Sequence, residues 1–194
     1  MDPSHSPVVS AREAAELLAI TDLPRTSIRR ALTAGVAGHP VRTRGALLYA
    51  RQDVVALAQP PLTLDDLPEP ANYGTFVARL RFGLADDVRF PDGLPEDDRR
   101  SSVSPGWQMG WLTCVTLELL ARKEKPMPML ATCGGFIVAG ATILGAHAES
   151  GHGSAALTLG PPGPWYADLH HRVLRTPPGR PWTILWARKA SRAA

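Results

Sequence analysis

The pattern of apolar and polar positions begins with two short amphipathic segments. In the first, residues 10–20, apolar side chains recur at helical spacing, which predicts a helix with one face turned toward a core. Ser10 and Glu13 have the spacing of a capping box, in which each side chain accepts a hydrogen bond from the backbone amide of the other residue. The apolar face of this helix comprises Ala14, Leu17 and Leu18. Residues 21–24 (TDLP) then interrupt the pattern.

A second helix is predicted between Pro24 and Gly35. Proline suits the first turn of a helix because its missing N–H has no partner there, and a glycine after the last turn adopts the left-handed conformation that ends many helices. The apolar positions, which share one face, are Ile28, Ala31 and Leu32. The polar positions that fall mostly elsewhere are Arg25, Ser27, Arg29 and Arg30. This helix is therefore expected to bury its aliphatic side chains and expose its arginines.

A hairpin and a third helix follow. Residues 39–50 contain two short strand-like pieces separated by Arg44 and Gly45, a pattern typical of a small hairpin with apolar positions at Val41, Leu47 and Tyr49. Residues 51–59 predict a helix that packs through Val54, Val55 and Leu57 and is stopped by two prolines. The acidic, proline-rich residues 61–73 are interpreted as a linker.

A strand, a loop and a longer helix are predicted next. Residues 75–84 alternate apolar and polar positions, as a half-buried strand does, and residues 85–104 predict a loop. Ser104 and Pro105 then begin a helix that extends to residue 125. Its expected core-facing positions are Trp107, Trp111, Val115 and Leu119, with Leu112 and Leu120 beside them.

Residues 127–148 carry no charged side chain and allow two interpretations. The stretch follows a basic segment and has about the length of a membrane-spanning helix. Its glycines also divide it into three pieces, each with the length of a buried strand, and we favour this interpretation. Residues 154–160 and 181–187 predict further strands, and residues 165–174 a short helix.

Together these patterns predict an α+β protein of two modules. Residues 8–60 form the first module and residues 74–190 the second, in which a tryptophan-rich helix packs on a small sheet. All five tryptophans follow Ser101, so the second module is expected to have a core of its own.

Composition and charge add little to this picture. The chain has 194 residues, a formal net charge of +3 and 44% hydrophobic residues, which suits a globular protein of two modules. Arginine outnumbers lysine eighteen to three, so the placement of the arginines matters more than their number. With two cysteines and no secretory leader, the sequence indicates a protein without a disulfide framework, located in a reducing cytoplasm.

The first module resembles the winged helix-turn-helix of excisionase-like and MerR-type DNA-binding proteins. The matching stretches, in order, are VSAREAAELLAI (residues 9–20), RTSIRRALTAG (25–35), VRTRGALLYA (41–50) and RQDVVALA (51–58). The resemblance covers about the first third of the chain. Two features depart from the family pattern: the TDLP turn is longer, and Ala31 and Leu32 replace the aromatic residue that often follows the paired basic residues.

The resemblance implies a set of contacts with double-stranded DNA. The second helix enters the major groove, where Arg25 and Arg29 are the candidates for guanine O6 and N7. Thr26, Ser27 and Arg30 are candidates for phosphate contacts near the same helix. Two further candidates, on the hairpin, are Arg42 and Arg44, which grip the DNA backbone or minor groove as a wing does in this family.

Other candidate sites have weaker patterns. His147, Glu149 and His152, and separately Asp168, His170 and His171, match no metal-ligand spacing and are interpreted as loop residues. Gly134 and Gly135 lack the lysine and hydroxyl of a phosphate-binding loop and indicate a turn between strands. Two buried thiols, Cys114 and Cys133, and an aromatic group comprising Trp165, Tyr166, Trp182 and Trp186 are assigned to the core rather than to a ligand pocket. No cofactor, metal site or catalytic residue is predicted.

The resulting hypothesis is a sequence-specific transcriptional regulator that is not an enzyme. Because a module this small contacts little DNA alone, a homodimer is expected, with the second module serving self-association or binding a small-molecule or protein effector. Three alternatives remain open: an excisionase-like protein that bends DNA, a DNA-directed enzyme that uses His147, His152, Asp168 and His171, and a membrane-tethered regulator.

Overall fold

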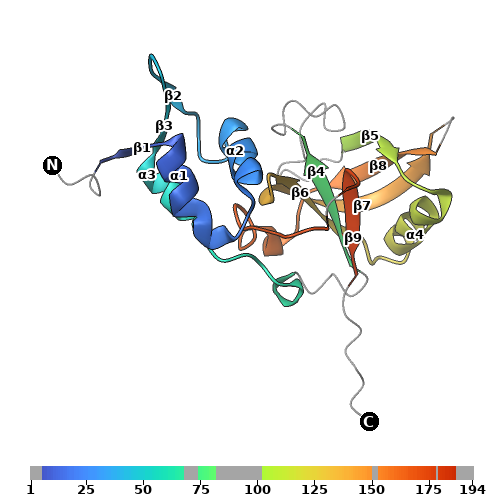
Figure 1. The fold of residues 1–194 in the computed structure, drawn as a ribbon. Coiled ribbons are helices and arrows are strands. Elements are labelled where there is room, and N and C mark those ends of the chain that lie inside the picture. The colour runs from blue at the N-terminus through green and yellow to red at the C-terminus, as the bar shows by residue number, and fades with distance from the viewer. Residues whose placement is uncertain (1–5, 68–73, 82–101, 150–152, 178, 187–194) are drawn as a thin grey trace, which may run out of the picture.

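The computed structural model contains two packed units, each with its own sheet (Figure 1). The structure describes residues 6–67, 74–81, 102–149, 153–177 and 179–186. Within these ranges, the first unit has three α-helices and a three-stranded sheet, and the second has a curled six-stranded sheet with one α-helix. The α+β class expected from the sequence is confirmed.

The first unit follows the predicted order of elements. Its helices are α1 (Ala11–Leu17), α2 (Arg25–Thr33) and α3 (Arg51–Leu57), and a 3₁₀ helix, η2 (Leu18–Thr21), extends α1. Strands β2 (Val41–Arg42) and β3 (Leu47–Ala50) form the predicted hairpin. A strand that was not predicted, β1 (Val8–Ser10), pairs antiparallel with the other side of β3.

Local signals at the ends of α1 and α2 are confirmed. The Glu13 amide donates to Ser10 Oγ at 3.3 Å and the Ser10 amide donates to Glu13 Oε2 at 2.7 Å, which completes the capping box. These hydrogen bonds from Ser10 lower the pKa of the Glu13 carboxyl. At the C-terminal end of α2, Gly35 follows the last turn and has φ +81°. The Val36 amide donates to the Ala31 carbonyl oxygen at 3.1 Å, as in a Schellman motif.

The core of the first unit is built from the apolar faces of its helices and from β3. Ala14, Ile28, Leu32 and Tyr49 are all buried, as expected. Val55 was predicted to pack but is 49% exposed, because α3 buries only the face that carries Val54 and Leu57.

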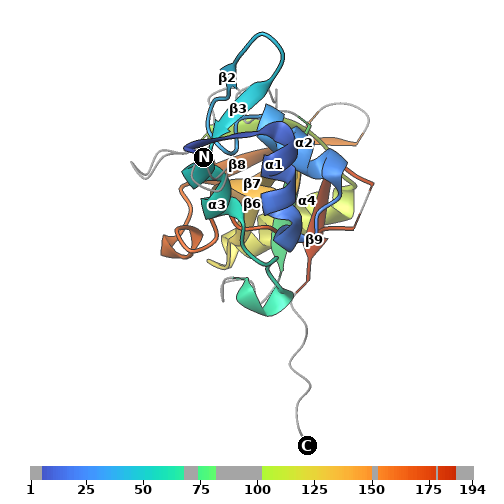
Figure 2. The ribbon, with the colours of Figure 1, turned by 60° about the vertical axis from the view of Figure 1, so that its left-hand side comes forward.

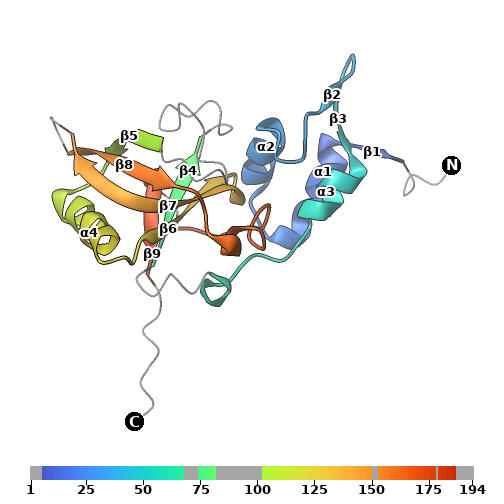
Figure 3. The same ribbon diagram turned by 180° about the vertical axis from the view of Figure 1, so that it is seen from behind.

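Six strands make up the sheet of the second unit, in the order β5-β8-β7-β6-β4-β9. They are β4 (Thr75–Leu80), β5 (Ser102–Gln108), β6 (Met127–Cys133), β7 (Phe136–Ala148), β8 (Ser154–Gly160) and β9 (Trp182–Leu185). Strand β4 runs parallel to β6, and the other neighbouring pairs are antiparallel. Helix α4 (Trp111–Arg122) packs on β7 and β6, at the end of the unit far from α2 (Figures 1 and 3).

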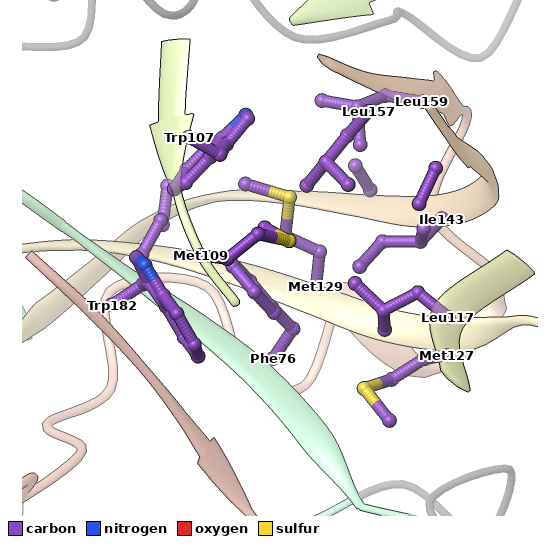
Figure 4. Packing of buried hydrophobic residues seen from close by; sticks show 14 of the residues in the cluster. Phe76, Trp107, Met109, Leu117, Met127, Met129, Ile143, Leu157, Leu159 and Trp182 are labelled. Carbon is purple, nitrogen blue, oxygen red and sulfur yellow. The ribbon is translucent and has the colours of Figure 1, made fainter. Parts of the chain in front are cut away.

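The concave side of this sheet encloses the main core (Figure 4). The Phe76 ring stacks on Trp182 and meets the Trp107 ring edge-on, with 5.3 Å between ring centroids in each pair. The indole N–H of Trp107 donates to Ser104 Oγ at 2.9 Å, so this fully buried ring has a partner for its polar atom. Leu117 of α4 closes the other end of the core.

The helix predicted over residues 106–125 is wrong at its start and in its face. Residues 102–108 form β5, which pairs with β8, and Trp107 is buried as a strand residue. The helix begins at Trp111, whose side chain is 73% exposed. Its buried residues are Cys114 and Leu117. Of the expected stripe, Trp111 and Leu119 are exposed and Val115 is half-buried. Of the two residues beside the stripe, Leu112 is exposed and Leu120 packs partly buried against the core. The second module therefore does not contain a tryptophan-rich helix packed on its sheet.

Strand β4 is buried on both faces, so the half-buried strand expected from its alternation is wrong. Phe76 and Leu80 join the main core, while Val77 packs in a second cluster on the opposite face. That second face is covered by the chain around Leu62 and by residues 164–174. The covering segment at 164–174 is a short 3₁₀ helix (Pro164–Tyr166) and turns rather than the predicted helix.

The uncharged residues 127–148 are buried strands, as favoured from the sequence. They form one hairpin, β6–β7, rather than three pieces, because Gly140 does not end a strand but lies under the Tyr166 ring. Gly134 and Gly135 make the predicted turn, and both have positive φ, as a two-residue type I′ hairpin loop requires. Among the described residues, no helix combines the length and the apolar character needed to span a membrane.

Candidate nucleic-acid interface

Helix α2 separates an apolar face from a cationic one. Ile28, Ala31 and Leu32 are at most 2% exposed and pack in the first unit's core. The exposed residues on the remaining surface are Arg25, Thr26, Arg29, Arg30 and Thr33. Since the burial of three aliphatic side chains fixes the rotation of α2, these polar residues project away from the core.

The turn before α2 is held by local hydrogen bonds. Thr21 Oγ1 donates to the Leu18 carbonyl oxygen at 2.6 Å, and the Asp22 amide donates to the Ala19 carbonyl oxygen at 3.0 Å. Asp22 adopts a left-handed conformation, with φ +51°, which aspartate tolerates better than most residues. The longer TDLP turn is thus an ordered connection that sets the angle between α1 and α2.

The β2–β3 hairpin projects from the first unit (Figure 2). Near its tip, the Thr43 amide and hydroxyl both donate to the Ala46 carbonyl oxygen, at 2.9 and 3.1 Å. Arg42 and Arg44 are exposed on this hairpin. Pairing of β3 with both β1 and β2 anchors the hairpin to the unit's core through Tyr49.

The arginines of α2 and the hairpin keep their charge available. Within the part of the chain that the structure describes, no ion pair joins Arg25, Arg29, Arg30, Arg42 or Arg44 to a carboxylate. The nearest acidic residue before α2, Asp22, is paired with Arg175 of the second unit. Five exposed guanidinium groups on one small unit suit the phosphates and guanine edges of a nucleic acid.

The second unit covers one side of α2. An added Cβ at Gly134 would clash with the Ser27 carbonyl oxygen and lie 3.0 Å from Ala31 Cβ, so the β6–β7 turn touches the helix directly. Gly135 packs in the same way against the Leu23 side chain. Ser27 is half-buried beside this turn, whereas the other six predicted contact residues are exposed.

The alternative sites do not assemble among the described residues. No three side chains of His147, Glu149, Asp168, His170 and His171 gather in a group that could hold a metal ion, and His152 lies outside the described residues. Three residues of the aromatic group divide between the two faces of the sheet, with Trp182 in the main core and Trp165 and Tyr166 on the other face. The assignment of Trp186 to the core is wrong, because this residue is 57% exposed. Burial raises the pKa of the Cys114 and Cys133 thiols, which favours the thiol over the nucleophilic thiolate.

Two features of the interface could not be predicted from local patterns. The contact between α2 and the second unit joins segments a hundred residues apart, and its only trace in the sequence is the Gly134–Gly135 pair. Arg79 and Arg175, which come from β4 and from the segment after residue 174, also lie beside α2. Neither arginine stands in a motif.

Comparison of the chain with protein-family models, with curated proteins and with solved structures finds no match.

Proposed function

We propose that the chain is a sequence-specific regulator of transcription that binds double-stranded DNA through a winged helix-turn-helix at residues 8–60. In this proposal α2 lies in the major groove, with Arg25 and Arg29 at base edges, and Thr26, Ser27 and Arg30 near phosphates. The hairpin acts as the wing, with Arg42 and Arg44 on the DNA backbone or in the minor groove.

The observation that supports this proposal is the pairing of a buried apolar face with exposed arginines on α2. Its buried face is fixed by the core, and none of its arginines is paired with a carboxylate of the described residues. If the arginines of α2 were merely a solvent-exposed helix face, nothing would call for a hairpin beside them. The hairpin follows α2 in the chain, as a wing does, and adds two more exposed arginines.

The experiment is a fluorescence anisotropy titration of labelled genomic DNA fragments at two salt concentrations. Arg25→Ala and Arg29→Ala should each weaken binding to the preferred fragment by about 1–3 kcal/mol and reduce discrimination between fragments. Arg42→Ala should weaken binding to all fragments and lower the salt slope by about 0.9 for each phosphate that the variant no longer neutralises. The matched control is Arg122→Ala, on α4, which should leave both the affinity and the salt slope unchanged.

Unchanged affinity in both α2 variants would refute the assignment of the contact face. A strong bend in the bound fragment would favour the architectural role over a plain regulator. A homodimer is part of the proposal because one module contacts too little DNA for selectivity, and the mass of the protein in solution, measured by light scattering, tests it.

A further inference from the structure

A pocket of about 600 Å³ lies in the seam between α2 and the second unit. Its walls come from the turn before α2 and from α2 itself on one side, and from the β6–β7 turn, β4, residues 174–176 and Gly179 on the other. The volume falls within the range of small-molecule sites, which occur often between domains. Because the pocket exists only where the two units meet, anything that fills it contacts both.

The polar lining is dominated by guanidinium groups. Arg30 reaches the pocket from α2, Arg79 from β4 and Arg175 from the segment that follows residue 174. Among the described residues of the lining, Asp22 supplies the carboxylate, and it is paired with Arg175. Ser27, Thr132 and Thr176 also line the pocket, where the Thr132 hydroxyl donates to the Ala78 carbonyl oxygen at 3.2 Å and Thr176 Oγ1 accepts from Arg79 Nε. Three cations around one opening match the oxygens of a phosphate or carboxylate group.

One of these cations is fixed in position. Arg79 Nε donates to Thr176 Oγ1 at 2.8 Å, and its terminal nitrogens donate to the carbonyl oxygens of Pro177 and Arg180. Burial lowers the pKa of the Arg79 guanidinium, and it stays charged at neutral pH because the ordinary value is so high. A cation that is already ordered loses little entropy when a ligand binds.

The apolar part of the lining lies beside these charges. Leu23, Leu80 and Leu174 form a hydrophobic wall, and Gly134 and Gly135 expose backbone next to it. An anionic group at the arginines would therefore leave room for an apolar body against the leucines. The lining suits a small molecule better than a DNA phosphate, because a duplex backbone offers no apolar group for this wall.

We propose that this pocket binds a small organic anion, which carries a phosphate or carboxylate on an apolar body, and that its occupancy changes the affinity of α2 for DNA. The effect on DNA depends on the proposed function, whereas the binding of the anion does not. Ser27 and Arg30 lie on α2 itself, so a ligand that draws them toward the second unit alters the position of the proposed DNA-reading helix.

The test is a nuclear magnetic resonance titration of the full chain, in which the amide signals of Gly134 and Gly135 are followed. The probes are phenyl phosphate, benzoate and the neutral benzyl alcohol, each at millimolar concentration. At least one anion should shift both amides to saturation, and the neutral probe should not. Comparison of the two anions identifies which charged group the pocket accepts.

Charge variants make the test specific. Arg30→Gln and Arg175→Gln should each weaken binding of the anion by roughly five- to tenfold, since each removes a charge-assisted contact. Asp22→Asn should strengthen it by roughly two- to fivefold, because it removes the competing carboxylate. Asparagine tolerates the left-handed conformation of this position, so the variant should fold. Arg122→Gln, far from the pocket, should leave the affinity for the anion unchanged.

Equal shifts with the neutral probe, no shift with either anion, or anion affinity that is unaffected by Arg30→Gln and Arg175→Gln would overturn the pocket assignment. Anion binding that follows the charge variants, in a protein that binds no DNA fragment, would leave the pocket standing and refute the proposed function. Saturating anion without any change in DNA affinity would overturn the coupling.

Discussion

Gly134→Ala should weaken the contact between the two units more than any other single-methyl change on the β6–β7 turn. The added Cβ would clash with the Ser27 carbonyl oxygen and lie 3.0 Å from the Ala31 amide nitrogen. Both atoms belong to the backbone of α2 and cannot rotate away, so either the helix or the turn must move. Overpacking of this kind costs about 1–3 kcal/mol.

A second cost comes from the backbone of the turn. Gly134 has φ +59°, a conformation in which a residue with a Cβ loses about 1–2 kcal/mol. The total expected decrease in the free energy of unfolding is therefore about 2–5 kcal/mol. For a chain of this length, each kcal/mol lowers the melting temperature by about 2–4 °C.

Gly106→Ala is the matched control. Gly106 has φ +76°, close to that of Gly134, but an added Cβ there would meet nothing within 4 Å. This variant should show only the backbone cost of about 1–2 kcal/mol. The difference between the two variants isolates the clash with α2.

The free energies of unfolding of both variants are measured by urea denaturation, followed by tryptophan fluorescence and by far-ultraviolet circular dichroism. Fluorescence reports the second unit, which holds all five tryptophans, while circular dichroism also reports the helices of the first unit. We expect the two transitions to separate in Gly134→Ala, because its clash falls on the contact between the units. Equal decreases in stability in Gly134→Ala and Gly106→Ala, with coincident transitions in both, would refute the direct packing of the turn on α2.

Three further predictions concern stability. Ser10→Ala should lower the free energy of unfolding by about 0.5–2 kcal/mol in urea, because it removes the cap of α1, and an unchanged value would mean that the capping box contributes nothing. The Ala146 amide donates to Glu118 Oε2 at 3.0 Å, and this hydrogen bond, with that from Arg122, lowers the pKa of the Glu118 carboxyl. The stability that Glu118 contributes is thus present above its unfolded pKa of about 4.3, and it is lost as the pH falls through the pKa of the folded state. Glu118→Gln should therefore have a lower free energy of unfolding than the parent protein at neutral pH, and the difference between the two proteins should shrink in acid. The rings of His170 and His171 stack with centroids 3.8 Å apart, and burial lowers the pKa of both imidazoles. The unfolded chain therefore takes up protons at higher pH than the folded chain, so the melting temperature should fall as the pH drops below about 6.5. His170→Gln should make that fall less steep, and an equally steep fall would contradict the role of this histidine in the pH dependence.

Local geometry explains which elements could be predicted from the sequence. The capping box at Ser10, the helix-ending Gly35 and the Gly134–Gly135 turn each encode a backbone conformation within a few residues. The periodicity of Ile28, Ala31 and Leu32 likewise fixes the buried face of α2 without reference to distant parts of the chain. These signals are enough to place the exposed arginines of the candidate interface.

The predictions from the sequence are wrong where a segment distant in the chain determines which secondary structure a residue adopts. Trp107 falls four residues before Trp111 and so imitates a helical stripe, but pairing with Ala155 of β8 makes it a strand residue. Gly140 resembles a break, yet β7 continues through it because the Tyr166 ring occupies the space that a side chain would fill. Helix propensity and period-two patterns contain no information about such partners.

The surroundings of α2 likewise combine features set by its own sequence with a contact set by a distant segment. Its three sides face the first unit's core, the β6–β7 turn and the surroundings, and only the first and last follow from its own sequence. Where it meets Gly134, this side consists of the Ser27 carbonyl oxygen, the Ala31 amide nitrogen and the Ala31 Cβ, whereas Gly135 meets the flexible Leu23 side chain just before α2. Closely packed backbones transmit a displacement rather than damping it. A change in the second unit near Gly134 must therefore be accommodated by α2, and with it by the arginines that α2 exposes.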